Sequence, residues 1–246
     1  MQEAEHRWWA EALFRPYVFY LMRRQFHGIY CLGQVPEIDP DYPLLLVPNH
    51  GTWWDGFLVY LLNVRLIGRT LYLMMLERQL RHYWFFQYVG AYPINPGNVA
   101  SVRKSLSYTA YTMERHTDRP VAICIFPQGE LRPGRFRSLS FRRGIEVVLK
   151  KYEGAVNLLP LGIYAGFFLE QRPEVYLRFG ENTVLSGQSF PGMEWLEQEV
   201  ESVLGKLRAG AGMEEGRRTT LLSRERSLIQ QIISGQIYPD GKGEKW

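Results

Sequence analysis

His50 and Asp55 are the residues of this 246-residue chain whose types and spacing most directly suggest chemistry. They stand in the segment PNHGTWWDG at 48–56, straight after an apolar run. A carboxylate that holds an imidazole lets the imidazole take a proton from a hydroxyl group, which a substrate can supply itself. The alternative is a capped helix with a structural histidine, and this spacing taken alone favours that alternative.

A strand and a helix must position these two side chains. We expect a strand at 43–48 and a helix at 54–64, with Thr52 as its candidate N-cap. Ligand sites in open α/β sheets collect at the carboxyl ends of strands. Asp55 would lie in the first helical turn, where the helix dipole favours an acid. This strand–turn–helix arrangement would bring Asp55 back against the imidazole of His50.

A second segment with chemical potential covers 120–144. An apolar strand is expected at 120–126 and leads into a Phe-Pro-Gln-Gly turn. The arginines that follow are interleaved with glycine and proline and are Arg132, Arg135, Arg137, Arg142 and Arg143. Most charge runs are solvated faces. A loop of this composition at a strand end also fits an anion-binding cradle.

The remaining patterns alternate between strands and helices. Strands are expected at 43–48, 70–75, 90–94, 120–126, 157–163 and 174–179, and helices at 54–64, 77–88, 98–115, 139–152 and 192–208. Such alternation predicts an α/β fold, with a mixed, partly parallel sheet flanked by helices.

The N-terminal segment at 1–30 is rich in aromatic residues and carries Arg15, Arg23 and Arg24. Apolar residues recur at helical spacing, although Pro16 would kink or divide the helix. Two interpretations stay open: a helix packed on the core, or an amphipathic helix at a membrane interface with its arginines on anionic lipid.

Three parts are expected along the chain. After the N-terminal segment, a catalytic domain would cover 31–208, and a linker with a helical tail would cover 209–246. The tail helix is expected at 219–236. No stretch reaches the ~20 apolar residues that a membrane-spanning helix needs. We therefore expect a peripheral protein, on the cytoplasmic face of a membrane.

The bulk composition narrows the partners. The net charge is +4, which suits phosphorylated ligands, anionic lipid or nucleic acid. No nucleic-acid-binding motif and no metal-ligand spacing is visible, so neither nucleic acid nor a metal is expected. Cys31 and Cys124 lie far apart and are expected to be reduced.

Taken together, the motifs resemble those of glycerolipid acyltransferases of the lysophosphatidate acyltransferase type. The family's Asn-His-x4-Asp hallmark is matched by Asn49, His50 and Asp55. A second block is matched in part at 90–95, with Arg103 displaced from the family's arginine. The third block, typically Phe-Pro-Glu-Gly-Thr-Arg-Ser and then Phe-Lys-x-Gly, corresponds to 126–132 and 141–144, and the fourth to 158–163.

The resemblance implies an O-acyltransferase that needs no cofactor. His50, oriented by Asp55, would be the general base for a lipid hydroxyl, and acyl-CoA or acyl carrier protein would be the acyl donor. Amides near Gly51 or Gly129 would stabilise the oxyanion, and Trp53 and Trp54 would line the acyl tunnel or pack in the core. The substrate-binding residues would be Asn49, Gln128, Gly129, Glu130, Arg132, Arg135 and Arg137.

The third block departs from the family pattern, which leaves the acceptor open. Gln128 replaces the family's glutamate, and Glu130 follows two positions later. Lysophosphatidate is the acceptor that the resemblance implies. A glycolipid or glycosylated terpenoid would also fit, because Gln128 and Glu130 both accept hydrogen bonds from hydroxyls. A catalytically silent lipid-binding module and a lipid hydrolase are the rival functions.

Overall fold

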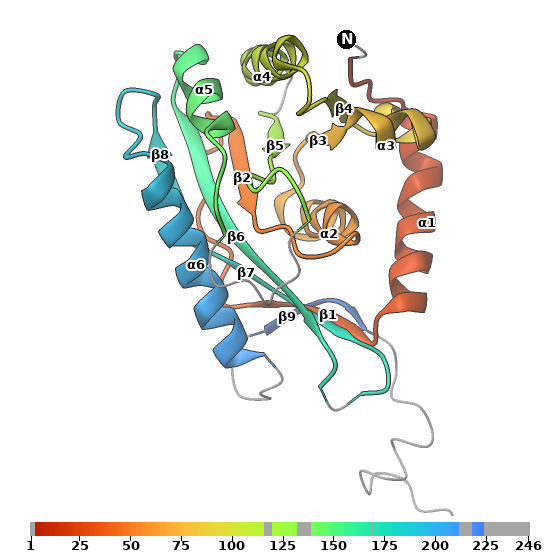
Figure 1. The fold of residues 1–246 in the computed structure, drawn as a ribbon. Helices are drawn as coiled ribbons and strands as arrows, with labels where there is room; N and C mark the ends of the chain where they lie inside the picture. The colour runs from red at the N-terminus through yellow and green to blue at the C-terminus, as the bar shows by residue number, and fades with distance from the viewer. Residues whose placement is uncertain (1–2, 116–119, 132–138, 169, 212–217, 224–246) are drawn as a thin grey trace, which may run out of the picture.

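The computed structural model describes residues 3–115, 120–131, 139–168, 170–211 and 218–223, and shows a single mixed sheet with helices on both faces (Figure 1). Eight strands follow the order β4-β3-β5-β2-β6-β7-β1-β9, and β8 pairs with β6. The strands are β1 (Gly28–Leu32), β2 (Leu44–Pro48), β3 (Leu71–Leu76), β4 (Ala91–Ile94), β5 (Ala122–Cys124), β6 (Val156–Gly166), β7 (Glu174–Phe179), β8 (Thr183–Leu185) and β9 (Arg218–Ser223).

The centre of the sheet is parallel, as expected for an α/β fold. β2 lies between β5 and β6 and runs parallel to both. β3 pairs in parallel with β4 and β5, and β1 with β7. The antiparallel pairs are β6 with β7, β6 with β8, and β1 with β9. The predicted fold class is confirmed.

Helices cover both faces of the sheet, which explains the continuous apolar run in β2. Leu44 and Leu46 face the core beneath α1 and α2, whereas Leu45 and Val47 face α4, α5 and α6. Strands buried on both faces need apolar residues at every position. The helices are α1 (Trp8–Gln25), α2 (Asp55–Leu62), α3 (Glu77–His82), α4 (Val99–Glu114), α5 (Gly144–Lys151) and α6 (Met193–Gly210), with a π-helical turn η1 (Asn63–Ile67) and a 3-10 turn η2 (Trp84–Tyr88).

The prediction of a tail helix at 219–236 is wrong for the part of this segment that the structure describes. Residues 218–223 form strand β9, which pairs with β1 and buries Leu221 and Leu222; the remainder, 224–246, lies outside the described residues. Sheet pairing decides the conformation here, because local propensity is weak beside tertiary packing. β1 itself crosses the expected segment boundary at residue 30 and joins the main sheet.

Two expected helices are shorter than the sequence indicated. The helix expected at 139–152 begins only at Gly144, because carboxylates of α6 capture the backbone amides before it. Glu197 accepts hydrogen bonds from the amides of Ser140 and Phe141 at 3.0 and 2.8 Å. The helix expected at 77–88 ends at His82 and gives way to the aromatic turn η2.

Helix α1 packs on the core, which is one of the two interpretations that the sequence left open. It is not divided at Pro16, and one stripe of it, including Phe14, Val18 and Met22, packs in the core. The hydroxyl of Tyr60 on α2 donates a hydrogen bond to Glu11 on α1. The other side leaves large apolar side chains in solvent, with Trp8 83% exposed. No helix in the described ranges is long and apolar enough to span a bilayer.

Candidate active site

The loop after β2 is held in place by Asn49. Its side-chain amide donates to the carbonyl of Ile163 at 3.0 Å and accepts from the amide of the same residue at 2.7 Å. Ile163 belongs to β6, the parallel neighbour of β2, so the side chain extends the sheet ladder by one rung. Asn49 is buried and both of its polar groups are used within the protein. This geometry supports a positioning role, rather than contact with a substrate.

Asp55 organises the turn between β2 and α2. Its carboxylate is fully buried and accepts hydrogen bonds from the backbone amides of Gly51 and Thr52 at 2.7 and 2.9 Å. The hydroxyl of Thr52 donates to the other carboxylate oxygen at 2.5 Å. Buried carboxylates are tolerated when donors surround them in this way. The acid at the start of α2 thus fixes the loop that carries His50.

The imidazole of His50 lies against this carboxylate. Nδ1 is 2.9 Å from Oδ2 of Asp55, and the ring stacks on Phe126 with centroids 4.1 Å apart. Because a carboxylate only accepts, we assign the proton to Nδ1, which leaves the lone pair on Nε2. The side chain is 22% exposed, so a ligand can reach it. The contact between His50 and Asp55 is the one that their spacing predicted.

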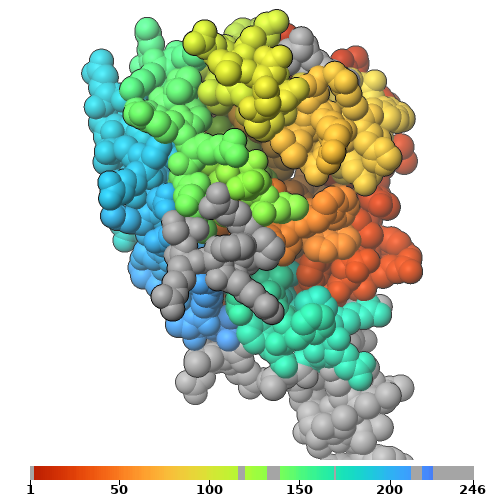
Figure 2. All heavy atoms as spheres, viewed as in Figure 1, coloured from red at the N-terminus to blue at the C-terminus, as the bar shows by residue number. Residues whose placement is uncertain are grey.

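Gln128 holds the backbone of His50, in addition to the contact of the imidazole with Asp55. Its side-chain carbonyl accepts a hydrogen bond from the backbone amide of His50 at 2.6 Å, and the residue is only 2% exposed. This joins the loop after β5 to the loop after β2. On the face shown in Figure 2, the segment after β5 (light green) lies beside the segment around α2 (orange), although they are far apart in the chain. Gln128 therefore contacts the loop that carries His50 directly.

The other residues of the predicted binding set fall into two groups. Gly129 has a φ of +70°, and a Cβ there would come within 2.8 Å of Nε of Arg142, so glycine allows the arginine to lie across the turn. Glu130 is exposed and lines the same hollow as His50. Arg132, Arg135 and Arg137 lie outside the described residues.

An apolar cavity of about 640 Å³ opens beside His50. Its walls come from α2, β3, β4, α4 and α5, and its charged lining residues are Glu130, Arg142 and Arg143. Arg143 forms an ion pair with Glu146, with Nε of the arginine 2.8 Å from Oε2 of the glutamate. Arg142 forms no ion pair with any residue that the structure describes. A volume of this size suits a ligand with a long apolar part.

Trp53 and Trp54 lie in different places: one lines the cavity, and the other packs in the core. Trp53 lines the cavity and is 44% exposed. Trp54 packs against the core, with its ring 5.8 Å from that of Phe26.

Arg142 belongs to the arginine cluster for which the sequence offered an anion-binding cradle, whereas Phe126 had no predicted role of its own. Phe126 lies two residues after the end of β5, the parallel neighbour of β2, so its position two residues before Gln128 was the available signal. The approach of Arg142 to Gly129 is visible only in the structure.

The thiol of Cys124, which lies near the site, is not activated as a nucleophile. Cys124 on β5 is fully buried, and burial together with the charge of Asp55 raises its pKa well above the ordinary value, so it remains a neutral thiol. In the parts of the chain that the structure covers, no three His, Cys, Asp or Glu side chains are grouped to hold a metal ion.

Comparison with known proteins bears on the fold and on the family. A search of solved structures matches the crystal structure of the 1-acyl-sn-glycerophosphate (LPA) acyltransferase PlsC from Thermotoga maritima, with a TM-score of 0.54, 18% identity, and coverage of 84% of this chain and 80% of that one. At this identity the likeness concerns the fold. No curated protein sequence matched the chain.

The family assignment comes from the sequence model for Acyltransferase, which matches residues 30–164, more than half of the chain. That range contains the His50–Asp55 pair, the Gln128 contact and all residues that line the cavity except Phe14. The resemblance to acyltransferases is confirmed: this chain belongs to the acyltransferase family.

Proposed function

We propose that the protein transfers a fatty acyl group from an acyl thioester to a hydroxyl of a membrane lipid, with His50 as general base. The acceptor we favour is a lysophospholipid such as 1-acylglycerol-3-phosphate. One observation carries the proposal: an imidazole held at Nδ1 by a buried carboxylate stands at the edge of a large apolar cavity. That is the base–orienter pair of acyl-transfer enzymes, placed beside room for a hydrocarbon chain.

The mechanism uses the substrate's own hydroxyl as nucleophile. Nε2 of His50 takes the hydroxyl proton while the oxygen attacks the thioester carbonyl and forms a tetrahedral oxyanion. Collapse of this intermediate breaks the C–S bond, and the imidazolium returns its proton to the departing thiolate. Asp55 stabilises the imidazolium without accepting the proton. A positioned base of this kind contributes ~10²–10⁴-fold to the rate.

The oxyanion needs a donor, and the two glycine amides of the turns already have acceptors within the protein. The amide of Gly51 donates to Asp55, and the amide of Gly129 donates to the carbonyl of Phe126 at 3.1 Å. Both candidate amides are therefore engaged already. Arg142 lines the cavity beside His50 and rests on the Gly129 turn, so we assign it the positive charge that faces the oxyanion or a substrate phosphate.

Membrane association is part of the proposal, because the acceptor is a bilayer lipid. The outer side of α1 exposes Trp8, and η2 exposes Trp84, at 83% and 58%. Arg15 and Arg24 lie on the same helix and are exposed. Aromatic side chains with nearby arginines suit the headgroup region of an anionic leaflet. We place the protein as a peripheral enzyme on the cytoplasmic face.

A panel of acceptors tests the proposed function. Purified protein is incubated with labelled palmitoyl-CoA and, separately, with lysophosphatidate, a neutral monoacylglycerol, a glycolipid and a glycosylated terpenoid. We expect labelled phosphatidate as the main product. Transfer to the uncharged acceptors instead would overturn the phospholipid assignment and support the alternative raised by Glu130. Absence of any product, with acyl carrier protein as donor as well, would indicate a silent lipid-binding module.

Gln128 provides a second prediction, since its carbonyl oxygen bonds the backbone of the catalytic histidine. Gln128→Glu keeps an acceptor at that position but adds a negative charge a few ångströms from the imidazole. A nearby carboxylate favours the protonated ring, which cannot act as a base. We expect the acid limb of the pH–rate profile to move to higher pH, by about one unit, and the melting temperature to fall, because the new carboxylate is buried.

A matched variant separates charge from packing. Gln128→Leu has a similar size but accepts no hydrogen bond, so it should lower the rate at every pH through disorder of the loop. A wild-type rate for Gln128→Leu would contradict the positioning role of Gln128, and an identical pH profile for wild type and Gln128→Glu would contradict the expected effect of the charge.

A further inference from the structure

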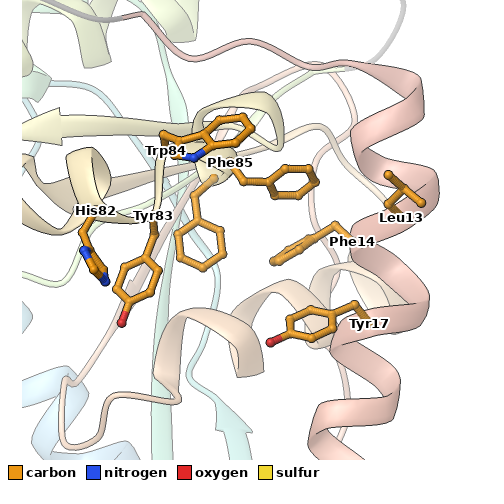
Figure 3. A pocket seen from close by; sticks show the side chains of 8 residues that line it. Leu13, Phe14, Tyr17, His82, Tyr83, Trp84 and Phe85 are labelled. Atoms are coloured by element: carbon orange, nitrogen blue, oxygen red, sulfur yellow. The ribbon is translucent and has the colours of Figure 1, made fainter.

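A second hollow lies outside the active-site cavity, between α1 and the aromatic turn η2 (Figure 3). Its volume is about 430 Å³, within the range of sites that bind small molecules, ~300–1,000 Å³. All of its lining residues except His82 are apolar or aromatic. In Figure 3, side chains of α1, including Leu13, Phe14 and Tyr17, face Tyr83, Trp84 and Phe85 across the groove.

The groove shares a wall with the active-site cavity. Phe14 and Phe86 line both hollows, and their rings meet edge to face with centroids 5.7 Å apart. Phe14 is almost fully buried, at 6% exposure, so this wall is part of the packed core. A chain in the groove would therefore lie one aromatic layer away from the cavity that His50 borders.

The outer rim of the groove is unusually apolar for a water-facing surface. Leu13, Tyr17 and Trp84 are 62%, 53% and 58% exposed. Contiguous exposed apolar surface marks a site of interaction with another apolar surface. The same helix and turn form the face that we propose meets the bilayer, so a lipid tail could enter the groove without crossing water.

Acyl transfer to a lipid requires places for two hydrocarbon chains near one histidine. The chain of a water-borne thioester must be hidden from water, which suits the cavity that contains His50. The tail of a bilayer-resident acceptor needs only a surface open on one side. We infer that the groove between α1 and η2 binds the hydrocarbon tail of the acceptor lipid, an inference that rests on the proposed acyl transfer.

A pair of variants on α1 tests this assignment. Leu13→Gln introduces a polar group at the rim of the groove, and Tyr20→Gln does the same at a position outside it; the two wild-type residues are 62% and 61% exposed. Both substitutions suit a helix. Each reduces the apolar surface of α1, so each should weaken vesicle binding to a similar extent.

Only the groove variant should change how strongly KM depends on the length of the acceptor tail. We expect Leu13→Gln to raise KM for a long-tailed lysophosphatidate about fivefold to tenfold, as loss of one apolar contact implies. KM for a lysophosphatidate with a very short tail, and for palmitoyl-CoA, should stay at the wild-type value. Tyr20→Gln should keep the wild-type ratio between long and short tails. Equal effects of both variants on that ratio would overturn the assignment.

Photolabelling reads the same groove without requiring turnover. Wild-type protein is irradiated with a lysophosphatidate that carries a photoreactive group at the end of its tail. We expect labelled peptides from α1 and from η2, whereas an acyl-CoA with the same group should label β3 in the cavity wall. Labelling of β3 by the acceptor probe, or no labelling by it, would overturn the inference. If the acceptor probe labels the groove but the protein shows no transferase activity, the proposed function alone would be refuted.

Discussion

His50→Ala is expected to reduce acyl transfer by ~10²–10⁴-fold, because it removes the group that accepts the hydroxyl proton. The loss should appear in kcat, since the apolar cavity that would hold the acyl chain is built mainly from α2, β3, β4, α4 and α5. KM for the acyl donor should therefore change little. The measurement is steady-state kinetics with labelled palmitoyl-CoA and lysophosphatidate.

A folding control is needed, because the imidazole also stacks on Phe126. The variant should keep its circular dichroism spectrum and its affinity for a non-hydrolysable acyl-CoA analogue. Loss of donor binding together with activity would show that the side chain supports the cavity rather than the chemistry. Activity within a few-fold of wild type would contradict the role of His50 as general base.

Asp55→Asn is expected to impair both rate and stability. The carboxylate oxygen Oδ2 accepts from His50 and from two backbone amides, and Oδ1 accepts from Thr52. An asparagine offers one accepting oxygen and turns its NH₂ group toward donors, so at least one donor loses its partner. In the serine protease triad, the corresponding change lowers kcat by about 10⁴-fold through the wrong histidine tautomer. We expect a loss of about 10³-fold or more here.

The stability cost follows from the complete burial of Asp55. Removing one member of a buried, charge-assisted network costs about 3 kcal/mol or more, which should appear as a lower midpoint in urea unfolding. Thr52→Val is the matched control: it removes the hydroxyl, which donates to Asp55 and accepts from the amide of Trp54 at 3.2 Å, and it keeps the backbone donor to Asp55. It should cost about 1 kcal/mol and less than tenfold in rate. A variant Asp55→Asn with wild-type rate and stability would refute this description of the turn.

The core of the sheet could be predicted because its signal is local. Strands such as β2 and β5 are short apolar runs, and burial on both faces of the sheet makes such runs continuous. β1 and β9 were not predicted, since their conformation depends on partners far along the chain. Ile29 pairs with Val175 and with Leu222, and neither pairing leaves a mark on the local sequence.

The candidate site divides in the same way. The contact of His50 with Asp55 follows from residues five positions apart across one turn, so the spacing was sufficient. The contact of Gln128 with the backbone of His50 requires β2 and β5 to be parallel neighbours, with Leu46 opposite Cys124. The sequence therefore suggested that Gln128 contacts the acceptor, whereas in the structure its side-chain carbonyl accepts a hydrogen bond from the backbone amide of His50. The sequence assigned Glu130 and Arg142 to a binding segment, but their place on the cavity beside His50, and the groove at α1, could be found only in three dimensions.

The central claim is that His50 catalyses transfer of an acyl group to a lipid hydroxyl. Its most direct test incubates wild type and His50→Ala with labelled palmitoyl-CoA and total membrane lipid, and identifies labelled products by mass spectrometry. We predict one class of acylated lipid with wild type, heavier than its acceptor by a palmitoyl group, and its loss with His50→Ala. The same labelled lipid formed at the same rate by both proteins would contradict the claim.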